Sequence, residues 1–451
     1  MIGSTSFAGV VSSSGLRIKM ESKEGAKFFF RLGISIGRAL EGSFLLGYDT
    51  RPSSEPFGQA LASGLNSVGM PVTVCGVLPV AAVSYLVVNR KADFGLMVTA
   101  SHNPPEWNGL KLFGPSGIIA DESVISSAVE KAIAIDTPPE IARFEHAEDM
   151  QETYVQGLRN EFRQLGVTAE GLRIAVDPGN GALSDLSISV LEMIGADVLA
   201  INCEMDGVFH RAIEPNAETL FGLSSLVRDQ NCDLGVGYDC DGDRAVLVGP
   251  KGMVLREDMT LLASLLFLLK RVRSSFVVSN ASSSAFTDLA RNTGRRVYVS
   301  KVGERNVAMR MRKTGSLLGG EGSCGGVIFS DLAMTRDGLL ATASSASLLA
   351  GGASISEALG PYTKYHASRF DIPFDRPSID ERRLFSSLKA TFPGVKSDEW
   401  DGLKFQEADG WVLVRPSKTE PVVRVIAEAL EAERAKSLAT KYATALRRIL
   451  S

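Results

Sequence analysis

A short acidic stretch, residues 239–244, carries three aspartates that alternate with other residues: Asp239, Asp241 and Asp243. Gly242 allows a tight turn there, so the three carboxylates can converge on one hard cation. An EF-hand is excluded, because its sixth and twelfth positions, counted from Asp239, hold arginine and proline here. Three carboxylates without a full cage of oxygens suit Mg²⁺, which shares its coordination with substrate oxygens. We therefore predict one magnesium ion per chain, and the alternative is a solvated acidic turn.

Four side chains near two polar loops are candidates for catalysis. Ser101, in the stretch TASHNPP, sits just past a predicted strand, where ligands bind in open α/β sheets. It is a candidate nucleophile or else a turn residue, and it is not the G-x-S-x-G elbow of α/β-hydrolases. Its neighbour His102 is also a catalytic candidate, although a residue adjacent in sequence is poorly placed to act as the general base of that serine. Lys111 is an acid or base if desolvation lowers its pKa, and otherwise a surface lysine. Arg244 is a candidate clamp for a phosphate or sugar oxygen.

Two further stretches are candidates for ligand binding. Residues 319–326, GGEGSCGG, allow close approach of the backbone to a ligand, and Glu321 and Ser323 there can accept hydrogen bonds from sugar hydroxyls. Residues 415–424 gather cations and hydroxyls into an anion cradle best suited to phosphate: Arg415, Ser417, Lys418, Thr419 and Arg424. The alternatives are a plain glycine loop and a charged surface turn.

Alternating helical and β-rich stretches must position these four segments. Helical periodicity predicts helices over residues 21–40, 55–68, 81–89 and 431–450. Short β-rich runs predict strands over residues 43–48, 72–77, 93–99, 171–177, 196–201, 233–239, 244–248, 275–278, 297–302, 401–406, 410–415 and 422–428. The pattern restarts twice, near residues 148 and 258, and changes character in the tail.

We therefore predict an α/β protein with three similar mixed-sheet α/β domains and a smaller C-terminal α+β domain around a central cleft. The 451 residues, at roughly 150 per domain, suggest about three domains. The predicted domains, which carry the serine, acidic, glycine-rich and anion-cradle segments in turn, are residues 1–147, 148–250, 251–367 and 368–451.

Composition excludes several classes of protein. Hydrophobic residues make up 45% and charged residues 22%, which is typical of globular chains. The net charge is −4 without a basic stripe, so we expect no nucleic-acid partner. The densest apolar run, residues 261–269, is far below the roughly 20 residues of a membrane span, so we predict a core helix and no membrane partner. Five scattered cysteines and the absence of a signal-peptide pattern predict reduced thiols and a cytoplasmic location.

Taken together and in this order, the four segments resemble the motifs of the α-D-phosphohexomutase family, whose members interconvert sugar 1-phosphates and 6-phosphates. TASHNPPEWNGLKLF resembles its phosphoserine loop, DCDGDR its magnesium loop, GGEGSCGG its sugar loop and RPSKTEPVVR its phosphate loop. Lesser matches lie at residues 12–17, 47–54, 176–182, 206–220 and 301–307, so the resemblance spans nearly the whole sequence. The four-domain architecture of that family agrees with the predicted domains.

The resemblance implies a role for each candidate. Ser101 would be phosphorylated and would complete the magnesium sphere together with the three aspartates. Arg17, Lys111 and Arg244 would line the reacting phosphate, with Lys111 as a general acid or base. The residues expected to bind the sugar or its non-reacting phosphate are Glu321, Ser323, Lys301, Arg415, Ser417, Lys418, Thr419 and Arg424.

The resemblance implies a phosphosugar mutase that works through a phosphoserine enzyme and a bisphosphorylated sugar intermediate. The leading prediction is a phosphomannomutase/phosphoglucomutase, with phosphoglucosamine mutase or phosphopentomutase as alternatives. A phosphatase, in which water takes the phosphoryl group from Ser101, and a non-catalytic sugar-phosphate sensor are alternatives of other classes. Whether the protein is a monomer or a homo-oligomer stays open.

The sequence departs from the family pattern at four places. One is the starting segment, which reads SSSGLRI rather than the commoner G-T-S-G-x-R-G. Many bacterial members have a G-E-x-S-G-H sugar loop, whereas Cys324 and Gly325 stand at the end of that stretch here and the histidine is absent. Glu304 occupies a position where some members have histidine, and Lys418 replaces a usual glycine. The sugar loop looks closer to that of archaeal members. These departures leave the reaction type intact and leave the preferred sugar and the general acid or base open.

Overall fold

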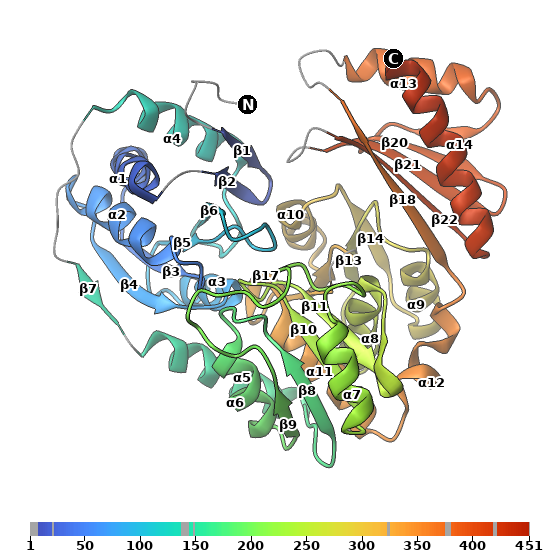
Figure 1. The fold of residues 1–451 in the computed structure, drawn as a ribbon, viewed down its shortest axis with the longest axis horizontal. Helices are drawn as coiled ribbons and strands as arrows, with labels where there is room; N and C mark the ends of the chain where they lie inside the picture. The colour runs from blue at the N-terminus through green and yellow to red at the C-terminus, as the bar shows by residue number, and fades with distance from the viewer. Residues whose placement is uncertain are drawn as a thin grey trace.

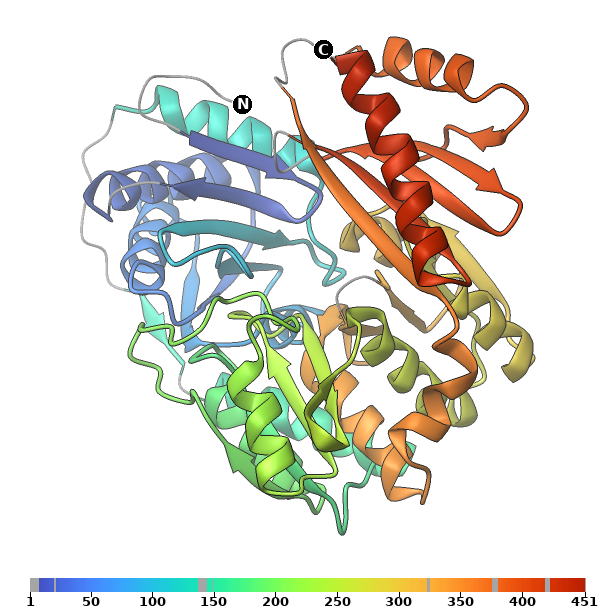
Figure 2. The ribbon, with the colours of Figure 1, turned by 45° about the vertical axis from the view of Figure 1, so that its right-hand side comes forward.

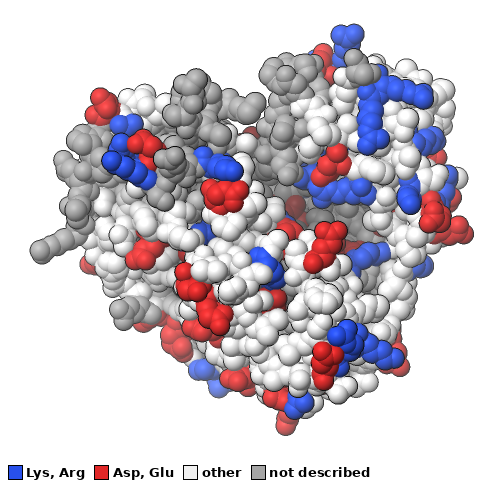
Figure 3. Space-filling view, in the orientation of Figure 1, with Lys and Arg blue, Asp and Glu red and all other residues white. Residues whose placement is uncertain are grey.

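The computed structural model describes residues 8–19, 22–136, 144–147, 149–322, 325–374, 380–417 and 422–450. Four sheets follow one another along the chain (Figure 1). The N-terminal domain, blue, and the C-terminal domain, red, stand on opposite sides, and the two middle domains join them from below (Figures 1 and 2). The surface is hollowed between the N-terminal and C-terminal domains (Figure 3).

The first domain is built on a mixed sheet with the strand order β1-β2-β6-β5-β3-β4-β7. Its strands are β1 Ala8–Ser12, β2 Gly15–Lys19, β3 Phe44–Tyr48, β4 Val72–Val77, β5 Phe94–Val98, β6 Trp107–Phe113 and β7 Glu145–His146. Its helices are α1 Ser22–Ala39, α2 Ser54–Asn66, α3 Val80–Val88 and α4 Glu122–Ala134.

The second domain has the strand order β12-β11-β10-β8-β9. Its elements are α5 Met150–Leu165, β8 Arg173–Asp177, α6 Ser184–Met193, β9 Asp197–Ala200, α7 Phe221–Asp229, β10 Leu234–Tyr238, β11 Ala245–Gly249 and β12 Met253–Val254. The third domain has the order β14-β13-β15-β16-β17. Its elements are α8 Glu257–Arg271, β13 Phe276–Ser279, α9 Ala285–Thr293, β14 Val297–Ser300, α10 Glu304–Thr314, β15 Leu318–Gly320, β16 Val327–Phe329, β17 Ala333–Asp337, α11 Gly338–Ala350 and α12 Ile355–Leu359.

These three sheets share one pattern of strand pairing. In each, three neighbouring parallel strands are followed by two antiparallel ones: β4-β3-β5 by β6-β2, β9-β8-β10 by β11-β12, and β14-β13-β15 by β16-β17. The turn from the third to the fourth strand carries the serine loop in the first domain, the acidic loop in the second and the glycine-rich loop in the third. The three predicted loops therefore occupy equivalent positions in three similar domains.

The C-terminal domain is different, because its sheet β18-β22-β21-β20-β19 is antiparallel throughout. Its elements are β18 His366–Pro373, α13 Glu381–Thr391, β19 Lys396–Asp398, β20 Leu403–Glu407, β21 Gly410–Pro416, β22 Val422–Ala429 and α14 Ala432–Leu450. This domain has a hydrophobic core of its own, formed between the sheet and its helices. The expected fold class, three similar α/β domains and a distinct C-terminal one, is confirmed.

One large hydrophobic cluster runs through the first three domains, from Leu45 to Tyr362. The apolar run 261–269 lies in α8, which is buried in that cluster as predicted. In the described part of the chain, no single helix has the length and apolar character of a membrane span. The pair formed by α11 and residues 355–362 meets those criteria together, but it is bent by 106° and α11 is a core helix.

Candidate active site

The acidic loop between β10 and β11 is a buried cluster of three carboxylates. Asp239, Asp241 and Asp243 are at most 1% exposed, and one oxygen from each lies within 4.8 Å of the others. The Oδ1 atoms of Asp241 and Asp243 accept no hydrogen bond from described residues. Burial and the two neighbouring carboxylates raise the pKa of Asp239. Orphaned oxygens and mutual repulsion fit a divalent cation, and a set of carboxylate oxygens is the kind of site that Mg²⁺ uses.

Lys111 lies against this cluster from the first domain. Its Nζ is 2.8 Å from Asp241 Oδ2 and donates to Asp243 Oδ2 at 2.7 Å. Burial lowers the pKa of Lys111, but Asp241, Asp243 and other nearby carboxylates outweigh burial and raise it above the ordinary lysine value. The side chain is 1% exposed, so the alternative of a surface lysine is excluded. Lys111 is therefore a buried ammonium group in this structure.

Ser101 is held beside the carboxylates in a strained conformation. Its hydroxyl donates to Asp239 Oδ2 at 2.8 Å, and its amide donates to Thr99 Oγ1 at 2.8 Å. Its φ of 52° lies in the left-handed region, which costs a non-glycine residue roughly 1–2 kcal/mol. The Nδ1 atom of His102 is 3.5 Å from Ser101 Oγ. Burial, Arg244 and Arg17 lower the pKa of His102, although part of its side chain remains exposed.

Arg51 clamps the serine loop and was not singled out as a functional residue from the sequence. Its side chain is fully buried, and its Nε donates to Asp49 Oδ2 at 3.1 Å. The remaining donors bind four backbone carbonyls of the loop. These belong to Ser101 at 2.6 Å, Asn103 and Pro104 at 2.7 Å each, and Trp107 at 3.2 Å. One guanidinium therefore fixes the path of the chain around Ser101.

Two predicted arginines complete the surroundings of the cluster. Arg244 donates to Glu214 through Nη1, at 2.6 Å to Oε1, and its Nε is 3.7 Å from Asp243 Oδ1. Arg17 is buried in β2, where its Nη1 donates to the backbone carbonyl of Leu16 at 2.9 Å. Burial lowers the pKa of Arg17, against the opposing influence of nearby carboxylates. Among the described residues, no carboxylate forms an ion pair with Arg17, which leaves its charge available to an anion.

Glu321 is the predicted sugar-binding residue that the structure brings closest to this cluster. It is buried, and its Oε1 accepts from the amide of Gly303 at 2.9 Å. Its Oε2 lies 3.4 Å from Nη1 of Arg336, which also donates to Asp243. Lys301 is exposed and forms no side-chain hydrogen bond or ion pair with another described residue. Ser323 lies outside the described residues.

The predicted phosphate loop belongs to the C-terminal sheet. Arg415 and Arg424 are directly opposite each other on β21 and β22, an arrangement that favours an anion between like charges. Arg415 Nε donates to Asp401 at 3.2 Å, and Arg424 Nε is 3.7 Å from Asp371. The amide of Ser417 donates to the carbonyl of Val422 at 2.8 Å. Lys418 and Thr419 lie outside the described residues.

Fold and site together define a multidomain α/β protein in which a buried cluster of carboxylates lies against cationic side chains of the first and third domains. Models of the phosphoglucomutase/phosphomannomutase family match the whole arrangement: α/β/α domain I at residues 10–138, domain II at 152–252, domain III at 257–365 and the C-terminal domain at 380–445. The chain belongs to this family, whose members are phosphosugar mutases, enzymes of the isomerase class.

Relatives over nearly the full length support the same assignment. A phosphoglucomutase/phosphomannomutase of Thermococcus kodakarensis is 33% identical over 91% of this chain and 92% of its own. A phosphoglucosamine mutase of Clostridioides difficile is 31% identical over 90% of each chain. A phosphoglucomutase/phosphomannomutase family protein from Burkholderia thailandensis has the same fold, with a TM-score of 0.79 and 23% identity over 97% of this chain and 98% of its own. The family predicted from the four motifs and the phosphohexomutase reaction are confirmed.

Proposed function

We propose that this phosphohexomutase converts the 1-phosphate and 6-phosphate of glucose or mannose into each other. The Thermococcus relative named phosphoglucomutase/phosphomannomutase supports this choice. Phosphoglucosamine is the next candidate, because a relative of almost equal identity is named phosphoglucosamine mutase. Pentose phosphates are a further alternative within the family. The observation that carries the proposal is the contact between Ser101 Oγ and the buried carboxylate cluster.

We assign the cation site to Asp239, Asp241, Asp243 and an oxygen carried on Ser101. When bound, Mg²⁺ offsets negative charge on the transferring phosphoryl group. Magnesium is also named, together with a phosphorylated sugar, for an N-acetylphosphoglucosamine mutase of Aspergillus fumigatus that shares this fold. That structure has a TM-score of 0.61 and 15% identity over 98% of this chain and 96% of its own, so it supports the fold only.

We assign the phosphoryl carrier role to Ser101. In each half of the reaction the bond between phosphorus and Ser101 Oγ breaks or forms, and the opposite happens at a sugar oxygen. The hydroxyl that attacks phosphorus, on the sugar in one half and on Ser101 in the other, must lose its proton, and the oxygen that departs from phosphorus must gain one. Lys111, as an ammonium, is placed to donate, and the ring of His102 is placed to accept. Arg17 and Arg244 bind the charge of the reacting phosphate.

We assign sugar recognition to Glu321, Ser323 and Lys301. The non-reacting phosphate is assigned to the C-terminal loop, which must accept it in both sugar orientations because the bisphosphorylated intermediate turns over between the two half reactions. Its assigned residues are Arg415, Ser417, Lys418, Thr419 and Arg424. The pairing of two arginines across β21 and β22 supports this role, since it gathers charge without specifying a sugar end.

We further propose the domain boundaries 1–147, 148–250, 251–367 and 368–451 and a cytoplasmic location. The division of the strands into four separate sheets supports four domains but moves two of the boundaries, because β12 at 253–254 pairs in the second sheet and β18 at 366–373 pairs in the fourth. Free thiols at Cys75, Cys203, Cys232 and Cys240 support a reducing compartment.

The test is a panel of glucose, mannose, glucosamine and ribose phosphates, with Mg²⁺ and a trace of the matching sugar bisphosphate, followed by phosphorus NMR. We expect conversion of 1-phosphate to 6-phosphate, phosphate on Ser101 by mass spectrometry, and loss of conversion by at least ~10³-fold in Ser101→Ala. Ser43→Ala, a hydroxyl of the same domain bonded to Asp93, is the control and should keep full activity. Full activity of Ser101→Ala would refute the assignment. Phosphate release without isomerisation would indicate a phosphatase, and tight binding without turnover a sensor.

A further inference from the structure

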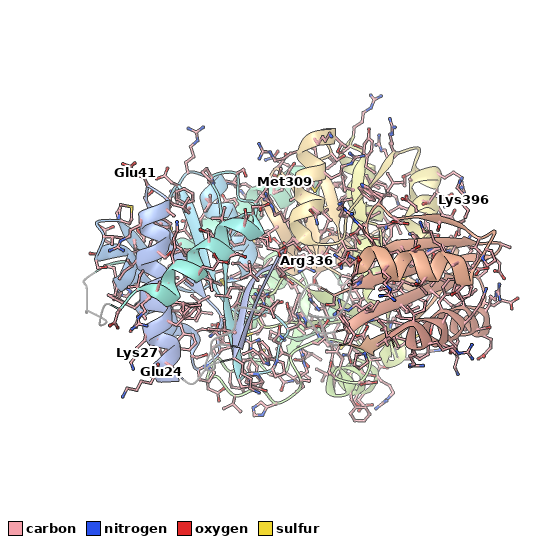
Figure 4. The ribbon with its side chains drawn as sticks, turned by 90° about the horizontal axis from the view of Figure 1, so that it is seen from above. Glu24, Lys27, Glu41, Met309, Arg336 and Lys396 are labelled. Atoms are coloured by element: carbon pink, nitrogen blue, oxygen red, sulfur yellow. The ribbon has the colours of Figure 1, made fainter. Side chains whose placement is uncertain are left out.

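Arg336, at the end of β17, joins three segments that are distant in sequence. It is 3% exposed, and Figure 4 shows it near the centre of the molecule, between the first domain and the C-terminal domain. Its Nη2 donates to Asp243 Oδ2 at 2.7 Å and is 3.6 Å from Glu304 Oε2. Its Nη1 is 3.4 Å from Glu321 Oε2. One guanidinium therefore faces a carboxylate of the acidic loop and a carboxylate of the glycine-rich loop.

The backbone around Arg336 is tied to the start of α10 and to the acidic loop. Its amide donates to Glu304 Oε1 at 2.7 Å, and the hydroxyl of Thr335 donates to the same oxygen. Two residues further on, the amide of Gly338 donates to the carbonyl of Gly242, in the acidic loop, at 3.0 Å. The segment that carries Arg336 is therefore anchored on both sides, and the guanidinium has little freedom to move alone.

The acidic and glycine-rich loops also touch each other directly. A Cβ atom on Gly326 would lie 2.0 Å from the carbonyl oxygen of Asp243, and one on Gly325 would lie 1.8 Å from that of Ala245. Only glycine permits this approach at either position. Because the two backbones are in contact, a displacement of one loop is transmitted to the other.

We propose that Arg336 is a positioning residue that couples cation binding at Asp243 to sugar binding at Glu321. The proposal rests on the proposed function, in which those two carboxylates hold the cation and the sugar. A divalent cation competes with the guanidinium for Asp243, because both are positive and both need its charge. Once the cation neutralises Asp243, the guanidinium of Arg336, held in place, interacts more strongly with Glu304 and Glu321 and fixes the acceptor for the sugar. Cation and sugar therefore favour each other's binding.

The coupling is measured on the full chain with Ser101 dephosphorylated, so that the serine keeps its oxygen and has no phosphoryl group to transfer. The dissociation constant for Mg²⁺ is determined by calorimetry without sugar and with saturating glucose 1-phosphate or mannose 1-phosphate. We expect Mg²⁺ to bind at least fivefold more tightly with sugar present, and the sugar to bind more tightly by the same factor with Mg²⁺ present. Adding Arg336→Met should reduce both factors to within twofold of one.

Two further variants are compared with Arg336→Met, one as a control and one as a conservative substitution. Arg295→Met removes an arginine of the same domain that bonds the carbonyl of Leu269, and it should leave the coupling factor unchanged. Arg336→Lys keeps the charge but loses the planar guanidinium, and it should lower the coupling factor at least threefold. This variant tests the proposal if Arg336→Met does not fold. A factor near one in the parent, or a factor that survives both Arg336 changes, overturns the proposal. Absence of binding by either sugar refutes the proposed function itself.

Discussion

The conformation of the serine loop depends largely on one side chain, that of Arg51. Four carbonyls of the loop accept from it, and Asp49 holds its Nε. The left-handed φ of Ser101 has an unfavourable energy on its own, so neighbouring contacts must impose it. The clamp and the bond between the amide of Ser101 and Thr99 supply those contacts. We infer that Arg51 aligns the nucleophile and does not bind the substrate.

Arg51→Met should therefore lower kcat by about 10²-fold with little change in KM, because a small misplacement of the reacting oxygen is costly. Steady-state kinetics on the preferred phosphosugar checks this. Arg38→Met, an exposed arginine at the end of α1, is the matched control and should behave as the parent. An increase in KM at unchanged kcat would place Arg51 in substrate binding instead.

The equivalent turns of the three α/β domains place their loops at one edge of each sheet, and the glycines of the third loop allow it to approach the second. Gly325 has a φ of 77°, and its missing Cβ makes room for the carbonyl of Ala245. This contact gives a physical reason for the departure seen in the sequence. With the backbones this close, a histidine cannot stand at position 325 without separating the two loops.

Gly325→Ala should be more destabilising than a glycine substitution at a comparable φ with open space around it. Gly294, the C-cap of α9, has a φ of 62°, and a methyl group added there would have nothing within 4 Å, so Gly294→Ala should cost about 1 kcal/mol of unfolding free energy. Gly325→Ala should cost a further ~1–3 kcal/mol for the overlap. Urea unfolding compares the two, and equal costs would contradict the close approach.

Sequence patterns predicted the elements that have a clear period and the loops that have a family resemblance. Strands such as β3, β4 and β10 are apolar runs, and their periodicity is local information. Strand β6 was not predicted, because Asn108 and Lys111 are polar and yet buried within it. Their burial depends on remote partners, the aspartates at 241 and 243 in the case of Lys111. Arg336 was not predicted as a functional residue for the same reason, because its partners are distant in the sequence. A charged residue between two apolar stretches is nevertheless a signal worth testing.

At the scale of the whole molecule, the C-terminal domain is attached to the third domain by partly buried polar contacts. Asp401 accepts from the amide of Val302 at 2.7 Å while it also holds Arg415, so it links the phosphate loop to the segment before α10. Lys404 donates to the carbonyl of Asn280 at 2.7 Å and lies 4.1 Å from the ring of Trp411. These contacts fix where the phosphate loop stands relative to the glycine-rich loop.

Lys404 should make the stability of this attachment depend on pH. Burial lowers its pKa to about 8, although Glu428, Asp398 and Asp401 raise it, whereas an unfolded lysine titrates near 10.4. Between those values the unfolded chain binds more protons, so stability rises with pH, and below about pH 8 the full cost of the buried charge applies. From pH 7 to pH 9.5 the gain should be about 2 kcal/mol.

Denaturant unfolding followed by tryptophan fluorescence at the two pH values measures this gain. Lys404→Met should lose it, while the exposed Lys436→Met should keep it. Because all other groups titrate equally in the three proteins, the difference between variants isolates Lys404. An identical pH response in parent and Lys404→Met would show that the lysine titrates as it does in water.

The separate core of the C-terminal domain bears on how this chain can evolve. The polypeptide enters that domain once, ahead of β18, and among the described strands none pairs across the entry. A recombination crossover just before His366 therefore divides no sheet and leaves the C-terminal hydrophobic cluster whole. The C-terminal domain can therefore be exchanged between relatives as a unit, provided that the incoming domain preserves the polar contacts made by Asp401, Lys404 and Glu428. If the C-terminal loop binds the non-reacting phosphate as proposed, recognition of that phosphate and recognition of the sugar can be inherited from different parents.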